Sequence, residues 1–101
     1  MNDDDLSGWA LPAFNADTAL AGLKRSLREL GLNERQGVFE QRGLAVVRVA
    51  VVDGVLQAER VKRPSRSSPE WLGSTLKDGA AVRHFTQSLK QQLASWSDRD
   101  D

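Results

Sequence analysis

The chain has 101 residues, of which 40% are apolar and 28% are charged, and these values suit a single small globular domain. Cysteine is absent, which excludes disulfides, zinc–thiolate sites and thiol nucleophiles, and the longest apolar stretch is too short to span a bilayer. The net charge is zero, yet residues 24–66 hold ten basic and five acidic side chains, so the middle is electropositive and both ends are acidic. We expect a cytoplasmic protein that does not enter a membrane.

Residues 1–13 show no apolar periodicity and begin with an acidic run, although Trp9 offers them a group to bury. We expect a partly ordered N-terminal segment there, a single α+β domain over residues 14–97, and a disordered acidic tail over residues 98–101. Keeping a neutral protein in solution is the simplest role for the acidic ends.

A helix is predicted to follow Asn15, a residue type that caps helix starts by accepting a backbone hydrogen bond. Leucines at spacings of three and four place one apolar stripe on this helix: Leu20, Leu23, Leu27 and Leu30. Gly31 can adopt the left-handed conformation that ends helices, and Leu32 can then fold back onto Leu27. Start, stripe and end agree on a helix that stops at Gly31.

Asp53-Gly54 lies between two apolar pairs of residues, which is the pattern of a two-residue hairpin turn. Counting outward from that turn pairs Arg48 with Glu59, and such a cross-strand ion pair favours this register. The same count gives the pairs Val52–Val55, Val51–Leu56, Ala50–Gln57, Val49–Ala58, Val47–Arg60 and Val46–Val61. An earlier strand over residues 37–41 is predicted to join through Arg42-Gly43. The sequence therefore predicts a three-stranded antiparallel meander.

Strand alternation divides the predicted sheet into two faces. One face is apolar and suits the helices: Ala45, Val47, Val49, Val51, Leu56 and Ala58. The other mixes polar residues with five apolar ones: Phe39, Val46, Val52, Val55 and Val61. Either the N-terminal segment, a second copy or a partner covers this face, or its valines simply reflect the strand preference of β-branched residues. These five residues are the candidate partner-binding face.

Two helices are predicted after the sheet. Ser68-Pro69-Glu70 has the composition of a helix start, and Trp71, Leu72 and Leu76 would give a short helix an apolar side. Asp78 is placed to cap a longer helix whose apolar stripe is Val82, Phe85, Leu89, Leu93 and Trp96. The predicted order of elements is α-β-β-β-α-α, with the helices packed on one face of the sheet.

Groupings of residues that carry catalysis are not evident in the sequence. The single histidine, His84, has no histidine, cysteine or carboxylate at helical spacing, and we expect it on the surface. No phosphate-binding glycine loop or nucleophile motif occurs, and tyrosine is absent. We therefore expect a chain that is not an enzyme and that uses no cofactor or metal.

Four bases cluster at the end of the third predicted strand and in the loop after it: Arg60, Lys62, Arg63 and Arg66. Guanidinium groups match the geometry of phosphates, so this segment is the candidate polyanion-binding site, with a merely solvated rim as the simpler alternative. The element order is similar to that of double-stranded-RNA-binding domains. Those domains have lysines at the start of the last helix, however, where this chain has Asp78.

The leading hypothesis is a small non-enzymatic domain that binds a protein partner or a second copy of itself, through the second sheet face or an exposed strand edge. The alternative is a weak nucleic-acid-binding module that uses residues 60–66. The sequence indicates neither the partner nor the biological process.

Overall fold

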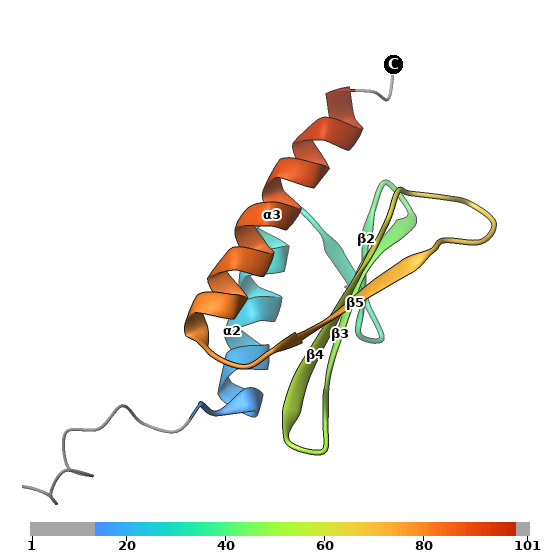
Figure 1. The fold of residues 1–101 in the computed structure, drawn as a ribbon. Coiled ribbons are helices and arrows are strands. Elements are labelled where there is room, and N and C mark those ends of the chain that lie inside the picture. Colours follow the sequence, from blue (N-terminus) through green and yellow to red (C-terminus); the bar gives the residue numbers. More distant parts are fainter. Residues whose placement is uncertain (1–13, 99–101) are drawn as a thin grey trace, which may run out of the picture.

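The computed structural model describes residues 14–98, and the predictions for residues 1–13 and 99–101 lie outside the described residues. Two helices and five strands follow in the order α2 (Ala16–Glu29), β1 (Asn33–Arg35), β2 (Val38–Gln41), β3 (Leu44–Val52), β4 (Val55–Val61), β5 (Trp71–Leu76) and α3 (Gly79–Asp98). The strands form one antiparallel sheet in sequence order, and both helices lie side by side on one of its faces (Figure 1). The α+β class is confirmed, whereas the predicted strand number and helix arrangement are not.

Helix α2 begins and ends as its sequence predicts. The Asn15 side chain accepts a hydrogen bond from the Thr18 backbone N–H at 2.9 Å, which caps the first turn. At the other end Gly31 has a φ of 92°, and the Leu32 N–H donates to the Leu27 carbonyl at 3.2 Å. Both Leu27 and Leu32 are buried, so the reversal of the chain also closes part of the core.

Three hairpins of the sheet use the same two-residue turn. In each turn a non-glycine residue and the glycine after it both have positive φ, which matches the right-handed twist of the flanking strands. The turns are Gln36-Gly37 (53° and 82°), Arg42-Gly43 (54° and 80°) and Asp53-Gly54 (53° and 75°). The first turn creates β1, a strand that the sequence analysis missed because it began the sheet at residue 37. The third sets the predicted register.

The predicted β3–β4 register is confirmed for six of its seven pairs, from Val52–Val55 to Val47–Arg60. The seventh, Val46–Val61, is not formed. A β-bulge lies here, because Phe39 of β2 pairs with Val47 while Glu40 pairs with Ala45, leaving Val46 without a partner on β2. The bulge also changes two assignments to faces: Phe39 shares the helix-side face with Val47, and Ala45 shares the opposite face with Glu40.

The segment predicted as a short helix is strand β5. It pairs with β4 from Val61–Trp71 to Leu56–Leu76. Six residues gain little as an isolated helix, and Gly73, Ser74 and Thr75 are weak helix formers. As a strand the same residues satisfy backbone groups along β4 that would otherwise form an open edge. Tertiary pairing therefore overrides the local helix-start signal of Ser68-Pro69-Glu70.

The last helix, α3, is confirmed. The Asp78 carboxylate accepts a hydrogen bond from the Ala81 N–H at 2.8 Å, which caps the helix start. Along its stripe Phe85, Leu89 and Leu93 are buried, and α3 continues to Asp98, the first residue of the predicted tail. Within residues 14–98 neither helix is long and apolar enough to cross a membrane.

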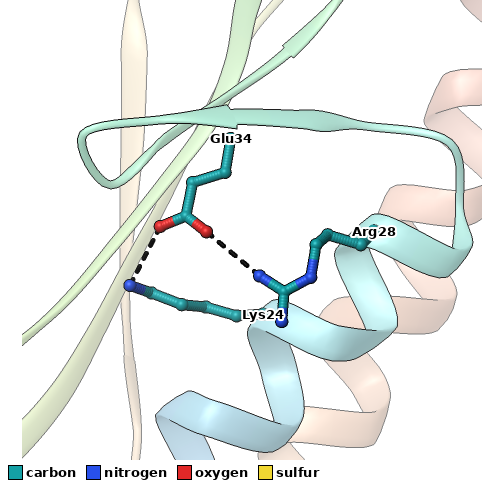
Figure 2. Close-up of polar contacts among 3 residues, drawn as sticks. All are labelled: Lys24, Arg28 and Glu34. Atoms are coloured by element: carbon teal, nitrogen blue, oxygen red, sulfur yellow. Dashed lines mark hydrogen bonds and ion pairs between the residues drawn. The ribbon is translucent and has the colours of Figure 1, made fainter.

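Strand β1 is held to α2 by charge. The Glu34 carboxylate lies 3.0 Å from the Lys24 Nζ and 3.1 Å from the Arg28 Nη1, so two cations of the helix converge on one acid of the strand (Figure 2). Its neighbour Arg35 lies 3.7 Å from Glu40 of β2. With only three residues, β1 has few backbone pairings, and the ion pairs to the helix supplement them.

Candidate functional site: an open strand edge and a cationic cleft

The structure divides the five residues of the candidate partner-binding face. Phe39, Val46 and Val61 are 0% exposed and belong to the hydrophobic core, so their side chains are not available to a partner. Val52 and Val55 are 51% and 37% exposed and lie at the tip of the β3–β4 hairpin. The five therefore do not form one continuous exposed surface. The bulge at Val46 and the pairing of Phe39 with Val47 explain most of this difference.

The sheet face opposite the helices has a polar and aromatic centre. The Arg48 Nε lies 2.5 Å from the Glu59 Oε1, and the Arg48 guanidinium lies 4.2 Å from the centroid of the Trp71 ring. The hydrogen bond from Arg48 holds the pKa of the Glu59 carboxyl below its ordinary value. Arg48 thus links three adjacent strands through its side chain, and this part of the face is organised within the chain itself.

Strand β5 forms one edge of the sheet, and within residues 14–98 no strand pairs with its outer side. The Lys62 N–H donates to the Glu70 carbonyl at 2.8 Å at the start of the β4–β5 ladder. Since antiparallel pairs alternate between hydrogen-bonded and non-hydrogen-bonded, the backbone groups of Trp71, Gly73 and Thr75 are directed away from β4. Along this edge the three residues therefore present backbone donors and acceptors that no strand within residues 14–98 pairs.

Devices that usually protect a strand edge are absent from β5. Its six residues include no charge and no proline, its ladder with β4 runs without a bulge, and residues 72–75 are exposed. Strand β1 at the opposite edge differs, because it has three residues and two of them, Glu34 and Arg35, are charged. Of the two edges of the described sheet, β5 has fewer of the features that block pairing with another strand. This edge was not predicted, because Ser68-Pro69-Glu70 has the composition of a helix start. In β5 the side chains of Trp71, Gly73 and Thr75 lie on one face and those of Leu72, Ser74 and Leu76 on the other, and this period of two was the feature of the sequence that could have indicated a strand.

Three of the four predicted polyanion-binding residues line one cleft, of about 620 Å³, together with residues that the sequence analysis did not associate with them. Lys62, Arg63 and Arg66 come from the loop between β4 and β5. The remaining lining residues come from the same loop, the β2–β3 hairpin and the last turns of α3: Gln41, Arg42, Leu44, Pro64, Gln92, Ser95 and Trp96. Arg60 is not among them; it is half-buried in β4, and its guanidinium donates to the Val61 carbonyl at 3.4 Å.

The residues that α3 contributes to this cleft could not be predicted from the sequence. Gln92 and Trp96 are about thirty residues from the basic loop in the chain, and only the packing of α3 on the sheet brings them to it. Figure 1 shows the C-terminal half of α3, the β2–β3 turn and the β4–β5 loop at the same end of the molecule. Arg42, from the turn between β2 and β3, also lines the cleft.

The remaining candidate for chemistry, His84, is exposed on α3. Among the residues that the structure describes, no group of three or more histidines, cysteines or acids is placed to hold a metal ion. The strand edge and the cationic cleft are thus the two surfaces with a specific physical character.

Comparisons with protein-family models, curated proteins and solved structures found no match to this chain.

Proposed function

We propose that this chain is a non-enzymatic interaction domain that self-associates through the outer edge of β5. The observation that carries the proposal is a six-residue edge strand without charge, proline or bulge, whose outward backbone groups have no partner in the described chain. A second copy of the same strand supplies a matching row of donors and acceptors. Antiparallel pairing of two β5 strands would join the two five-stranded sheets into one of ten strands.

A second copy suits this edge for two further reasons. Pairing centred on Gly73 places each strand's outward backbone groups opposite those of the other, since Trp71, Gly73 and Thr75 are spaced symmetrically about it. Leu72, which is 39% exposed at this edge, would lose water contact on pairing. Six paired residues are a small interface compared with the roughly 1,200–2,000 Å² of a stable complex. We therefore expect a dimer that dissociates on dilution.

Gly73→Pro tests the edge directly. Proline removes the outward N–H at the centre of β5 but leaves the hydrogen bonds to β4, because the Gly73 N–H is directed away from β4. A Cβ at Gly73 would meet only the Glu59 Cγ at 3.8 Å, which is an ordinary contact. We expect the weight-average mass from light scattering to rise with concentration for the natural chain and to stay at 11.1 kDa for the variant. Unchanged circular dichroism would show that the variant is folded.

Ala50→Lys is the matched control. Ala50 is exposed on the central strand β3, on the sheet face opposite the helices, away from the β5 edge. The substitution adds a charge to that open face and should leave association through the edge unchanged. A dimer that survives Gly73→Pro and is lost in Ala50→Lys would overturn the edge in favour of the open face. A natural chain that is monomeric at millimolar concentration would end the proposal of self-association.

A second candidate function is weak binding of nucleic acid as a polyanion. Its basis is the cluster of Lys62, Arg63 and Arg66, whose side chains make no ion pair or hydrogen bond with any described residue. Binding of generic duplex DNA should then fall steeply as salt rises, because phosphate contacts release counterions. The double variant Arg63→Glu/Arg66→Glu should abolish it, and absence of binding by the natural chain at low salt would end this candidate.

A further inference from the structure

The cleft beside the basic loop combines a cationic wall with an apolar one. Three cations of the loop line it, Lys62, Arg63 and Arg66, and none of the described residues that line it is acidic. Elsewhere some cations are paired with acids, as Lys24 and Arg28 are with Glu34 (Figure 2), and others are spread singly over the surface, such as Arg25 on α2. Lys62, Arg63 and Arg66 make no ion pair with a described residue, and their concentration in one concave place favours an anionic ligand.

The backbone that carries these cations is held in place. The Lys62 N–H bonds to the Glu70 carbonyl at 2.8 Å and closes the base of the loop. At the tip the Ser65 Oγ accepts from the N–H groups of Ser67 and Ser68, each at 3.3 Å. Pro64 lies between Arg63 and Ser65 and fixes one more backbone angle. A loop ordered in this way loses little conformational entropy when its cations bind a ligand.

The other wall of the cleft suits a flat apolar group. Trp96 and Leu44 line it, and Trp96 is partly buried and packed against the core. Indole rings stack well on other aromatic rings. Gln41 and Gln92 add carboxamides, which can both donate and accept hydrogen bonds at the edge of a ring. The volume of about 620 Å³ is that of a small-molecule site.

We propose that this cleft binds a nucleotide-sized ligand, in which a phosphate monoester contacts Lys62, Arg63 and Arg66 while an attached aromatic base stacks on Trp96. Guanidinium groups bind phosphate in a bidentate manner, so arginines suit a phosphate monoester at this wall. The proposal deepens the polyanion candidate, because it replaces an extended phosphate backbone by one compact site. The same chemistry is present in a free mononucleotide and in the terminal nucleotide of a single strand.

The experiment uses the full chain with Trp9→Phe and Trp71→Phe, which leaves Trp96 as the single tryptophan of the three. Titration with adenosine 5′-monophosphate at low salt should quench the Trp96 fluorescence to saturation. Inorganic phosphate and adenosine, which each supply half of the ligand, should bind at least about tenfold more weakly, because each lacks either the charge-assisted bonds or the stacking. A short single strand with a 5′-phosphate, compared with the same strand without it, shows whether the site also accepts a terminal nucleotide.

The variants Arg63→Glu/Arg66→Glu and Arg25→Glu distinguish binding in the cleft from an effect of the net charge of the chain. The first should weaken nucleotide binding by tenfold or more, whereas Arg25 is exposed on α2 and does not line the cleft. Equal losses in both variants, or no saturable quenching at millimolar nucleotide, would overturn the inference. Duplex DNA binding without nucleotide binding would leave the polyanion candidate standing and remove only the cleft. Nucleotide binding without duplex binding would support the cleft and show that these bases bind a compact phosphate ligand and not an extended phosphate backbone.

Discussion

At the scale of single residues, the contact between Arg48 and Glu59 connects sequence, register and pH dependence. Arg48 donates to both oxygens of the carboxylate and stacks over Trp71. The pKa of Glu59 is lowered chiefly by the hydrogen bond from Arg48; desolvation opposes this shift, and the positive charge of Arg48 adds a lesser lowering. A glutamate whose pKa is lower in the folded chain than in the unfolded one stabilises the fold only while it is ionised in the folded chain.

We therefore expect the contribution of Glu59 to be complete above the ordinary glutamate pKa of about 4.3 and to be lost as the pH falls through the lowered folded value. Glu59→Gln should reduce the urea midpoint at pH 7, and the difference from the natural chain should shrink below about pH 4. Glu29→Gln is the control, since Glu29 is exposed and makes no ion pair with a described residue. A difference that is independent of pH would show that Arg48 and Glu59 do not form this contact in solution.

The same pair shows why a register can be read from sequence. An Asp-Gly turn fixes the count of residues on both strands, and opposite charges at equal distances from it then confirm the alignment. Six pairs follow from that one turn. The count fails at Val46, where a bulge inserts a residue. No residue type in the local sequence marks this bulge, so the burial of Val46 and the helix-side position of Phe39 were not predictable from alternation alone.

At the scale of elements, local and tertiary signals agree in the helices and conflict in β5. Asn15, Gly31 and Asp78 act within one turn of their own helix, so sequence alone identifies α2 and α3. Residues 68–70 carry an equally good helix start, but no helix follows. The β4 backbone requires hydrogen-bond partners along its full length, and that requirement comes from outside the segment. An edge strand is therefore the element whose identity its own sequence determines least.

Strand β1 illustrates a related difficulty. Its three residues are exposed and polar, so they show no apolar pattern. The one local indication of a further hairpin is Gln36-Gly37, a polar residue followed by glycine, as in the turns Arg42-Gly43 and Asp53-Gly54. Glu34 holds the strand to α2 through Lys24 and Arg28 (Figure 2). This contact joins residues six and ten positions apart across a helix end. The sequence shows the charges, whereas the convergence of two cations on one acid requires the chain reversal at Gly31.

At the scale of the whole molecule, the two proposed surfaces differ in how far sequence could identify them. The basic loop was identified because its charges are adjacent in the chain, but the Trp96 wall of the cleft depends on how α3 packs. The β5 edge depends on sheet order, which only tertiary structure defines. Both surfaces lie outside the core, so substitutions there should change binding without unfolding the chain. Substitutions in the core should instead lower the free energy of unfolding.

Phe39 and Val52, both predicted to belong to the candidate partner-binding face, differ in whether they lie in the core or on the surface. Phe39 is 0% exposed and packs in the single core cluster, whereas Val52 is 51% exposed at the hairpin tip. Phe39→Ala removes a buried ring and leaves a cavity, so we expect the free energy of unfolding to fall by about 3–5 kcal/mol in a urea titration. Val52→Thr keeps the β-branched shape in an exposed strand position and should change the free energy of unfolding by less than about 0.5 kcal/mol.

Equal losses of stability in the two variants would mean that the hairpin tip is covered by another part of the chain or by a second copy. Light scattering on Val52→Thr would separate these two cases, because only coverage by a second copy changes the association state.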